Sequence, residues 1–401
     1  MNPQLSALQP YPFQKLSALL AGASPAALRP INLSIGEPKH ATPPFIRDAL
    51  TANLSGLSSY PATAGSESLR RTVAGWIKNR FGVSDIDPLR QVLPVNGSRE
   101  ALFAFAQTVI DPSRARAVVV SPNPFYQIYE GAALLAGAEP QFLNQLPDNN
   151  FAMDRTQLPD EVWSRTQLIY VCSPANPTGN VMTLSEWKSL FELSDRYGFV
   201  IASDECYSEI YFDEAAPPLG ALDAAWRLGR GDFRRLVSFS SLSKRSNVPG
   251  MRSGFVAGDA EIIAKFLLYR TYHGCAMNPA IQAASETAWR DESHVVENRR
   301  LYRKKFERVV AILGEVTEVT MPQAAFYLWL PTPIPDTEFA KGLFNQYNVT
   351  VLPGSFLARE ARGVNPGQNF VRIALVASVE ECIEAGQRLR DYIRQLTLRK
   401  T

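Results

Sequence analysis

One lysine of this chain lies in a setting that suits covalent chemistry. Lys244 follows the hydroxyl residues Ser241 and Ser243. The apolar run Leu236–Phe239 precedes them, and Arg252 comes eight residues after the lysine. Two hydroxyls and a guanidinium can bind a phosphate, with the planar arginine fork adding charge-assisted hydrogen bonds. A lone lysine is more often a solvated surface residue, but a lysine beside a phosphate site is what a pyridoxal-phosphate enzyme needs, because its amine must condense with the cofactor's aldehyde.

A carboxylate and a phenol follow another apolar run. Asp204 comes two residues after Phe199–Ala202, and Tyr207 comes three residues after Asp204. A carboxylate here can pair with the pyridinium nitrogen and hold it protonated, which makes the ring an electron sink. The hydroxyl of Tyr207 can serve the ring oxygen O3′. The plainer alternative is a helix start, with Asp204 as N-cap and Glu205 in the first turn.

Two turn-like motifs supply further polar groups. SPANPTG places Asn176 after the run Leu168–Cys172, where its amide can donate to O3′ and to a substrate carboxylate; a simple Pro/Gly/Asn turn is the alternative. In NGSREAL, the main-chain N–H groups of Ser98 and Arg99 begin a good helix-forming stretch. Because a helix N-terminus attracts anions, these groups would point at a bound anion such as a phosphate.

The chemically interesting residues follow short β-branched runs that alternate with helix-length segments. Such alternation is typical of an α/β sheet with helices on both faces. Ligands of open α/β sheets bind beyond the carboxyl ends of the strands, so we expect these loops to share one site. The predicted strands are Gln91–Val95, Ala117–Val120, Leu168–Cys172, Phe199–Ala202, Leu236–Phe239 and Gly254–Ala257.

The two ends of the chain differ from this middle part. Residues 1–40 form a loop-like arm rich in Pro and Ser, which we assign to a smaller domain. From about residue 285, a charged helical stretch leads into the strand-like segments FYLWL and FVRIAL. We therefore predict a large cofactor-binding domain over residues 41–285 and a small C-terminal α/β domain over residues 286–401.

Composition limits the other classes of function. Of 401 residues, 46% are hydrophobic and 20% charged, and 41 basic against 39 acidic side chains give a net charge of +2. No run of five Lys or Arg occurs, so we expect no nucleic-acid partner. No stretch approaches the roughly 20 apolar residues of a membrane helix, and the N-terminal segment lacks the features of a signal peptide. We expect a cytoplasmic protein with no membrane partner.

Cysteine and histidine are scarce. Four cysteines lie far apart with no CxxC pair, which argues against a zinc ribbon and against a disulfide framework. Three histidines are too few for a His-rich metal site. We predict reduced thiols and no metal. The residues are Cys172, Cys206, Cys275 and Cys382, and His40, His273 and His294.

Taken together, the motifs resemble those of the fold-type I pyridoxal-phosphate aminotransferases of class I/II. SPANPTG, DECY, SLSK with PGMR, and FVRIAL occur in the family's order, and the resemblance runs from about residue 10 to the C-terminus. It implies a large domain with a mostly parallel seven-stranded sheet flanked by helices, and a smaller α/β C-terminal domain. It also implies pyridoxal 5′-phosphate as the cofactor and a homodimer as the assembly.

The resemblance assigns roles around the cofactor. Lys244 would form the Schiff base and later shuttle the proton, while Asp204 would pair with the ring nitrogen. Tyr207 and Asn176 would bind O3′, and Tyr126 would stack on the ring, although a core aromatic is the alternative for it. The implied phosphate ligands are Ser98, Arg99, Ser241, Ser243, Arg252 and, from a neighbouring subunit, Tyr60.

The resemblance also places the substrate. Arg372 would grip the α-carboxylate bidentately, Gly36 would contact it through its main chain, and Asn176 would assist. The distal end of the substrate is not assigned. Candidates by position alone, each more often a packing or solvated residue, are Lys15, Arg29, Tyr272, His273 and Phe326.

One departure from the family pattern bears on specificity. Many members have an aromatic residue two positions after the lysine, whereas this chain has Ser246 within RSNVPG. That run, with YPFQKLSAL and GMRSGFVAGD, is similar to the N-succinyl-diaminopimelate aminotransferases of lysine and peptidoglycan biosynthesis. The reaction implied is amino transfer between N-succinyl-LL-2,6-diaminopimelate and 2-oxoglutarate.

Other functions share the same residues. An aminotransferase of aromatic, aspartate or kynurenine type, or a β-elimination lyase, would need the same cofactor and carboxylate ligands. A regulator that uses this fold to sense a ligand would need a DNA-binding module as well. Because the resemblance starts near residue 10, we expect an enzyme rather than such a regulator.

Overall fold

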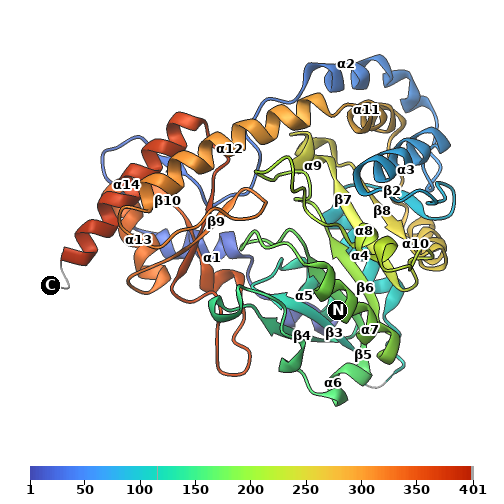
Figure 1. Cartoon of the computed structure of the whole chain (residues 1–401), viewed down its shortest axis with the longest axis horizontal. Coiled ribbons are helices and arrows are strands. Elements are labelled where there is room, and N and C mark those ends of the chain that lie inside the picture. Colours follow the sequence, from blue (N-terminus) through green and yellow to red (C-terminus); the bar gives the residue numbers. More distant parts are fainter. Residues whose placement is uncertain (115, 399–401) are drawn as a thin grey trace.

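Seven strands form the central sheet of the computed structural model, which describes residues 1–114 and 116–398 (Figure 1). Their order is β2-β8-β7-β6-β5-β3-β4, and β8 runs opposite to the other six strands of this sheet. The mostly parallel seven-stranded sheet expected from the sequence is thus confirmed. The strands are β2 (Val92–Val95), β3 (Val118–Asn123), β4 (Glu139–Asn144), β5 (Thr166–Cys172), β6 (Val200–Asp204), β7 (Leu236–Ser241) and β8 (Gly254–Gly258).

Each of the six apolar runs identified in the sequence lies in a strand or begins one residue before it, but β4 was not predicted. Its residues, EPQFLN, mix polar and apolar side chains, and the first four are only half-buried. β4 lies at the edge of the sheet, where it pairs with β3 alone. An edge strand faces solvent, so it does not need the continuous apolar run of a central parallel strand.

Helices cover both faces of this sheet. Along β5, Ile169 and Val171 join one hydrophobic cluster, whereas Leu168 and Tyr170 join another. Successive side chains of a strand point to opposite faces, so each face has its own core. The helices are α1 (Pro12–Leu20), α2 (Pro44–Ala52), α3 (Glu67–Phe81), α4 (Ser98–Val109), α5 (Ile128–Leu135), α6 (Asp160–Arg165), α7 (Leu184–Tyr197), α8 (Ala221–Arg227), α9 (Leu242–Arg245), α10 (Ala260–His273), α11 (Pro279–Arg290), α12 (Ser293–Leu313), α13 (Asp336–Tyr347) and α14 (Val379–Leu398). Short 3-10 turns are η1 (Pro3–Ala7), η2 (Leu54–Ser58), η3 (Pro147–Asn149), η4 (Arg155–Gln157), η5 (Pro249–Met251) and η6 (Gly354–Leu357).

Local sequence sets the ends of the long surface helices. α7 begins with a capping box, in which the Thr183 hydroxyl accepts from the Glu186 N–H and Glu186 accepts from the Thr183 N–H. It ends at Gly198, whose φ of 81° lies in the left-handed region that glycine adopts without strain. These signals fix where α7 ends and β6 begins, and therefore the position of Asp204 at the end of β6.

A second, smaller unit is built on three antiparallel strands in the order β11-β12-β9. α13 and α14 pack on it, and α12 extends in Figure 1 from beside α11 to beside α14. Residues 31–33 of the N-terminal arm join this core, because β1 pairs with β10. The division at residues 41 and 286 stays a prediction. The strands are β1 (Ile31–Asn32), β9 (Tyr327–Pro331), β10 (Val349–Thr350), β11 (Leu352–Pro353) and β12 (Phe370–Ala374).

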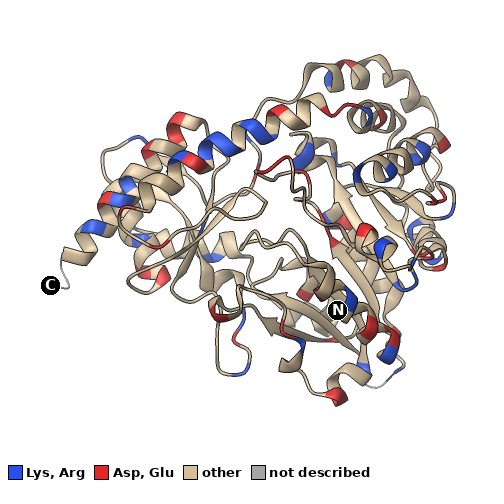
Figure 2. Cartoon of the chain, in the orientation of Figure 1, with Lys and Arg blue, Asp and Glu red and all other residues tan. Residues whose placement is uncertain are grey.

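Charge and thiol chemistry follow the composition. Basic and acidic residues are interspersed over the ribbon in Figure 2. All four cysteines are free thiols. Within residues 1–114 and 116–398, no helix combines the length and the apolar character needed to cross a membrane.

Candidate active site

The carboxyl ends of the parallel strands open onto a cavity of about 470 Å³ that also reaches the smaller unit. The cavity brings together residues from motifs as far apart in the chain as the N-terminal arm and β12. Twelve of the thirteen predicted site residues line it, and Tyr60 is the exception. The twelve are Gly36, Ser98, Arg99, Tyr126, Asn176, Asp204, Tyr207, Ser241, Ser243, Lys244, Arg252 and Arg372.

Lys244 projects into this cavity from α9, the short helix that follows β7. Its Nζ donates to the carbonyl oxygen of Gly36 at 2.6 Å and lies 5.4 Å from the centre of the Phe326 ring. Burial lowers the pKa of the Lys244 amine to about 8, because the charged form loses solvation there. An amine with such a pKa is partly neutral near pH 8 and can act as a nucleophile or a base.

The start of α4 and the loop around Arg252 form a cup for an anion. Gly97 precedes α4 with a φ of 86°, and a Cβ at this position would lie 2.1 Å from Arg252 Nη2. Because glycine has no Cβ, the Arg252 guanidinium can lie against the backbone at Gly97, just before α4 begins. Arg252 Nη1 also donates to Ser243 Oγ at 3.4 Å. A cationic cradle at a helix N-terminus fits the phosphate of pyridoxal phosphate.

Asp204 ends β6 on the floor of the cavity. Its Oδ2 accepts a 2.7 Å hydrogen bond from the hydroxyl of Tyr129, and its Oδ1 accepts from the Cys206 N–H at 3.3 Å. Burial raises the pKa of Asp204, while the hydrogen bonds from Cys206 and Tyr129 act in the opposite sense. The chain after Asp204 is a turn, and α8 begins only at Ala221, so the helix-start alternative is wrong.

Tyr129 is a site residue that the sequence reasoning missed. It lies on α5, three residues after Tyr126, and is fully buried with its ring stacked on Tyr170 at 4.6 Å. Tyr126 lies just before α5, and its ring meets the Tyr129 ring edge-on with the ring centres 5.8 Å apart, so a second tyrosine three residues after the predicted stacking residue was a usable signal. Tyr126 itself lines the cavity, where its hydroxyl accepts from Arg99 Nε at 2.5 Å.

The opposite wall of the cavity comes from the smaller unit. Arg372 lies on β12 and donates from Nη1 to Asn176 Oδ1 at 3.0 Å and from Nη2 to the carbonyl of Ser34 at 2.9 Å. Its guanidinium lies 4.4 Å from the ring centre of Tyr327. Within the described residues, its buried Nε has no hydrogen-bond partner. A buried guanidinium without a carboxylate partner suits a substrate carboxylate.

Tyr60 and the five distal candidates lie outside the residues that line the cavity. Tyr60 is fully exposed, and Tyr272 is 88% exposed. Arg29 forms surface ion pairs with Glu381 and Glu384, so its charge is already matched. Phe326 alone among the five contacts the site, because it packs below Lys244. The remaining two are Lys15 and His273.

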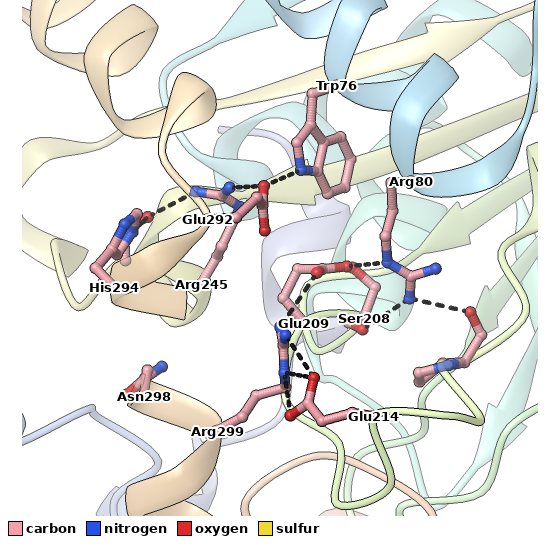
Figure 3. Close-up of polar contacts among 12 residues, drawn as sticks. Trp76, Arg80, Ser208, Glu209, Glu214, Arg245, Glu292, His294, Asn298 and Arg299 are labelled. Atoms are coloured by element: carbon pink, nitrogen blue, oxygen red, sulfur yellow. Dashed lines mark hydrogen bonds and ion pairs between the residues drawn. The ribbon is translucent and has the colours of Figure 1, made fainter. Parts of the chain in front are cut away.

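Arg245, the residue after Lys244, lies in the RSNVPG segment that departs from the usual family pattern. Its guanidinium is buried over the rings of Trp76 and Trp289 and donates to the Ala288 carbonyl at 2.7 Å. It also forms an ion pair with Glu292 (Figure 3). A buried arginine must be paired and hydrogen-bonded to be tolerated. This cluster therefore anchors the backbone beside Lys244 to the start of α12.

A second set of charges in Figure 3 connects α12 to the loop after β6. Arg299 lies 2.8 Å from Glu214 and 3.8 Å from Glu209, which in turn is 2.9 Å from Arg80 of α3. The same helix holds Asn298, whose Nδ2 donates to the main-chain carbonyl of Lys244 at 3.4 Å. The helix that joins the two units thus supports the lysine from behind.

Glu100, His273 and Cys275 form a cluster outside the cavity whose ligand-type atoms lie within 4.8 Å of one another. The Glu100 carboxylate is already paired with Arg270 at 2.6 Å, and His273 Nδ1 lies 2.9 Å from Cys275 Sγ. Burial raises the pKa of Cys275 to about 11, which disfavours the thiolate that a metal needs. We assign no metal to this cluster.

Known proteins match this chain along almost its whole length. An aminotransferase from Neisseria meningitidis Z2491 is 54% identical and has a TM-score of 0.94, with 97% of this chain and 99% of that one covered. The LL-diaminopimelate aminotransferase of Syntrophobacter fumaroxidans is 32% identical over 96% of this chain and 97% of its own. A probable N-succinyldiaminopimelate aminotransferase from Thermus thermophilus is 25% identical, with a TM-score of 0.83 over 95% and 100% of the two chains.

The family described as aminotransferase class I and II matches residues 29–389, which is most of the chain. This match agrees with the mostly parallel seven-stranded sheet described above. The chain belongs to the class I and II aminotransferases and is a pyridoxal-phosphate-dependent aminotransferase.

Proposed function

We propose that this enzyme transfers the amino group of N-succinyl-LL-2,6-diaminopimelate to 2-oxoglutarate, in the cytoplasm and in the route to diaminopimelate and lysine. The names of the relatives support diaminopimelate chemistry, since several are LL-diaminopimelate aminotransferases and one is a probable N-succinyldiaminopimelate aminotransferase. Unsuccinylated LL-2,6-diaminopimelate is the alternative donor that the first of these names favours.

The charged side chains that line the cavity are the observation that supports the succinylated compound as the donor. When the cofactor is bound, Arg252 faces its phosphate, Asp204 its ring nitrogen, and Arg372 the substrate α-carboxylate. Lys244 is linked to the cofactor, and Arg99 holds the phosphate through its main-chain N–H. The Arg99 guanidinium, which donates only to the neutral Tyr126 hydroxyl, is then the cation of the lining without an acidic partner, since Glu37 is already paired with Lys39 at 3.0 Å. The distal end of the succinylated donor carries only carboxylates and an amide, whereas that of free diaminopimelate also carries an ammonium. An unmatched guanidinium favours the former.

The residues of the cavity divide the work of holding the cofactor and substrate. Bound pyridoxal phosphate supplies an electron sink that stabilises negative charge at the substrate Cα. Asp204 keeps the ring nitrogen protonated, Asn176 and Tyr207 donate to O3′, and Tyr126 covers the ring. The proposed phosphate ligands are Ser98, Arg99, Ser241, Ser243, Arg252 and, from a second subunit, Tyr60.

Lys244 carries the cofactor at rest and moves the proton during turnover. With the cofactor bound, Lys244 would hold its aldehyde carbon, and once a substrate amine takes that place the free Nζ would move a proton between the substrate Cα and the cofactor carbon C4′. Arg372 and the main chain of Gly36 hold the α-carboxylate, so the Cα–H bond stays within reach of Nζ. When 2-oxoglutarate takes up the amino group in the second half-reaction, Lys244 would move the proton in the opposite direction.

The lowered pKa of Lys244 predicts how the cofactor-free protein takes up pyridoxal phosphate. Capture needs the neutral amine, so its rate should rise with pH through about 8 and level off above it. An ordinary lysine, with a pKa near 10.4, would still gain about tenfold per pH unit there. Stopped-flow absorbance between pH 6 and 10 measures the rate, with Nα-acetyl-lysine, whose side-chain amine is free, as the reference amine. A rate that keeps climbing beyond pH 9 would contradict the role of burial.

A panel of amino donors tests the proposed substrate. The succinylated donor, free LL-2,6-diaminopimelate, aspartate, an aromatic amino acid and kynurenine are each assayed with 2-oxoglutarate, and glutamate formation is measured. We expect the highest kcat/KM for the succinylated donor. A higher value for any other donor would replace it as the substrate. Release of ammonia without 2-oxoglutarate, from an amino acid that carries a leaving group on Cβ, would indicate a β-elimination lyase.

We propose a homodimer in which Tyr60 serves the partner's phosphate site. Its side chain is fully exposed in a single chain, and the preceding turn η2 exposes Leu54 and Leu57. A phenol that contributes to its own cavity would be at least partly covered. Exposed large apolar residues beside it fit an interface with a second copy of the chain.

Mixing two impaired variants, at a cofactor concentration that leaves the Tyr60→Ala homodimer largely empty, tests this arrangement. Tyr60→Ala should weaken cofactor binding about tenfold, since one hydrogen bond to a charged group is lost. Lys244→Ala subunits mixed with Tyr60→Ala subunits should regain roughly a quarter of the wild-type activity, because each mixed dimer contains one complete site. No recovery after verified exchange of subunits, or a fully active monomer in sedimentation, would refute the shared site.

A further inference from the structure

Tyr327 lies between Arg372, Tyr207 and Gly36, whose carbonyl accepts from Lys244. It begins β9 and is 2% exposed. In the register of the small sheet, Tyr327 pairs with Ala374 and so lies diagonal to Arg372, two residues earlier on β12. This register places the Arg372 guanidinium over the Tyr327 ring, 4.4 Å from its centre.

The hydroxyl of Tyr327 reaches the other unit of the fold. It lies 2.9 Å from the hydroxyl of Tyr207, which follows β6 of the large sheet. A Cβ added to Gly36 would lie 1.9 Å from the same hydroxyl, and the carbonyl of Gly36 accepts from Lys244. Tyr327 thus fills the space that glycine leaves at position 36, between Arg372 and Tyr207.

The contact between the two hydroxyls has a direction once the cofactor is considered. Burial raises the pKa of both phenols, so each keeps its single proton at neutral pH. If Tyr207 donates that proton to the cofactor oxygen O3′, it can only accept from Tyr327. Tyr327 must then be the donor, and its hydrogen bond keeps the Tyr207 proton pointed at O3′.

We propose that Tyr327 is a positioning residue that couples substrate binding to the cofactor. Its ring supports Arg372 on the small unit, and its hydroxyl orients Tyr207 on the large one. The inference rests on the proposed roles of Tyr207 and Arg372. It adds a residue that no motif singled out and gives a reason for glycine at position 36.

Tyr327→Phe separates the two roles, because it removes the hydroxyl and keeps the ring under Arg372. A weaker donor to O3′ makes the linked lysine–cofactor unit more basic, so the pKa of its pH-dependent visible absorbance should rise by about half to one unit. We expect kcat to fall about 3- to 30-fold, and KM for the amino donor to change by less than about twofold.

A double-mutant cycle decides whether Tyr327 acts through Tyr207. Tyr207→Phe alone should raise the spectral pKa further than Tyr327→Phe, and the double variant should match Tyr207→Phe alone, because the second hydroxyl then has nothing to orient. Tyr302→Phe is the matched control. Its hydroxyl is buried in the same hydrophobic cluster without a hydrogen-bond partner among the described residues, so its removal should leave the spectral pKa unchanged.

The outcomes separate this inference from the proposed function. A wild-type protein without a pH-dependent cofactor band would refute the assignment of the site itself. If the wild type shows the band but Tyr327→Phe leaves its pKa unchanged, or if the two tyrosine effects add, Tyr327 does not act through Tyr207. Thermal unfolding of each variant checks that the fold is retained, and a loss of fold in Tyr327→Phe would itself contradict a role confined to positioning.

Discussion

Lys244→Ala is expected to abolish amino transfer, with kcat lower by about 10⁴-fold or more, because one side chain supplies both the covalent link and the proton transfer. The cradle of Arg252 and the start of α4 stays intact, so the variant should still bind pyridoxal phosphate, though without the covalent link. Single-turnover assays with the best donor of the panel measure the loss.

A surface lysine provides the control for this experiment. Lys188 on α7 is exposed and lies 4.0 Å from Glu192, so Lys188→Ala should keep essentially full activity. If Lys244→Ala retained more than about a tenth of the wild-type rate, another group would have to carry the proton, and the role given to Lys244 would be wrong.

Arg372→Lys is expected to cost about 2–4 kcal/mol, or roughly 30- to 1,000-fold in kcat/KM. Lysine keeps the positive charge but loses the fork that reaches a carboxylate at two points. It also loses the bonds with which Arg372 is held by Asn176 and Ser34. The loss should fall on both half-reactions, because glutamate and the succinylated donor share an α-carboxylate.

The distribution of the loss tests the position of Arg372. Cofactor affinity should barely change, since no proposed phosphate or ring contact is altered. Arg29→Lys, on a surface ion pair with Glu381, should have little effect and serves as the control. A variant of Arg372 that is impaired only toward the succinylated donor would place this arginine at the distal end of the substrate.

Much of the cavity could be predicted because its residues follow strands. Lys244, Asp204 and Asn176 each lie just beyond an apolar run, and parallel neighbouring strands bring their carboxyl ends to one edge. The sheet therefore brings motifs that are far apart in the sequence to one site. Arg372 was placed through the family resemblance instead, since an antiparallel strand of another sheet carries it.

The contacts that the sequence did not reveal are those between elements. Tyr129 meets Asp204 across 75 positions of the chain, and Tyr327 meets Tyr207 across 120. Buried tyrosines in a helix and a strand look like ordinary core residues until packing shows where their hydroxyls point. Arg245 is similar, because only the fold shows the tryptophans and carboxylate that accept a buried guanidinium.

Borohydride reduction followed by peptide mapping tests the central claim most directly. Reduction converts the bond between the cofactor's aldehyde carbon and a lysine amine into a stable secondary amine. Mass spectrometry then identifies the lysine that carries the cofactor. We expect a single labelled peptide that contains Lys244, and no label in the Lys244→Ala variant. Label on any other lysine, or no label on protein that has bound the cofactor, would contradict the assignment on which the mechanism depends.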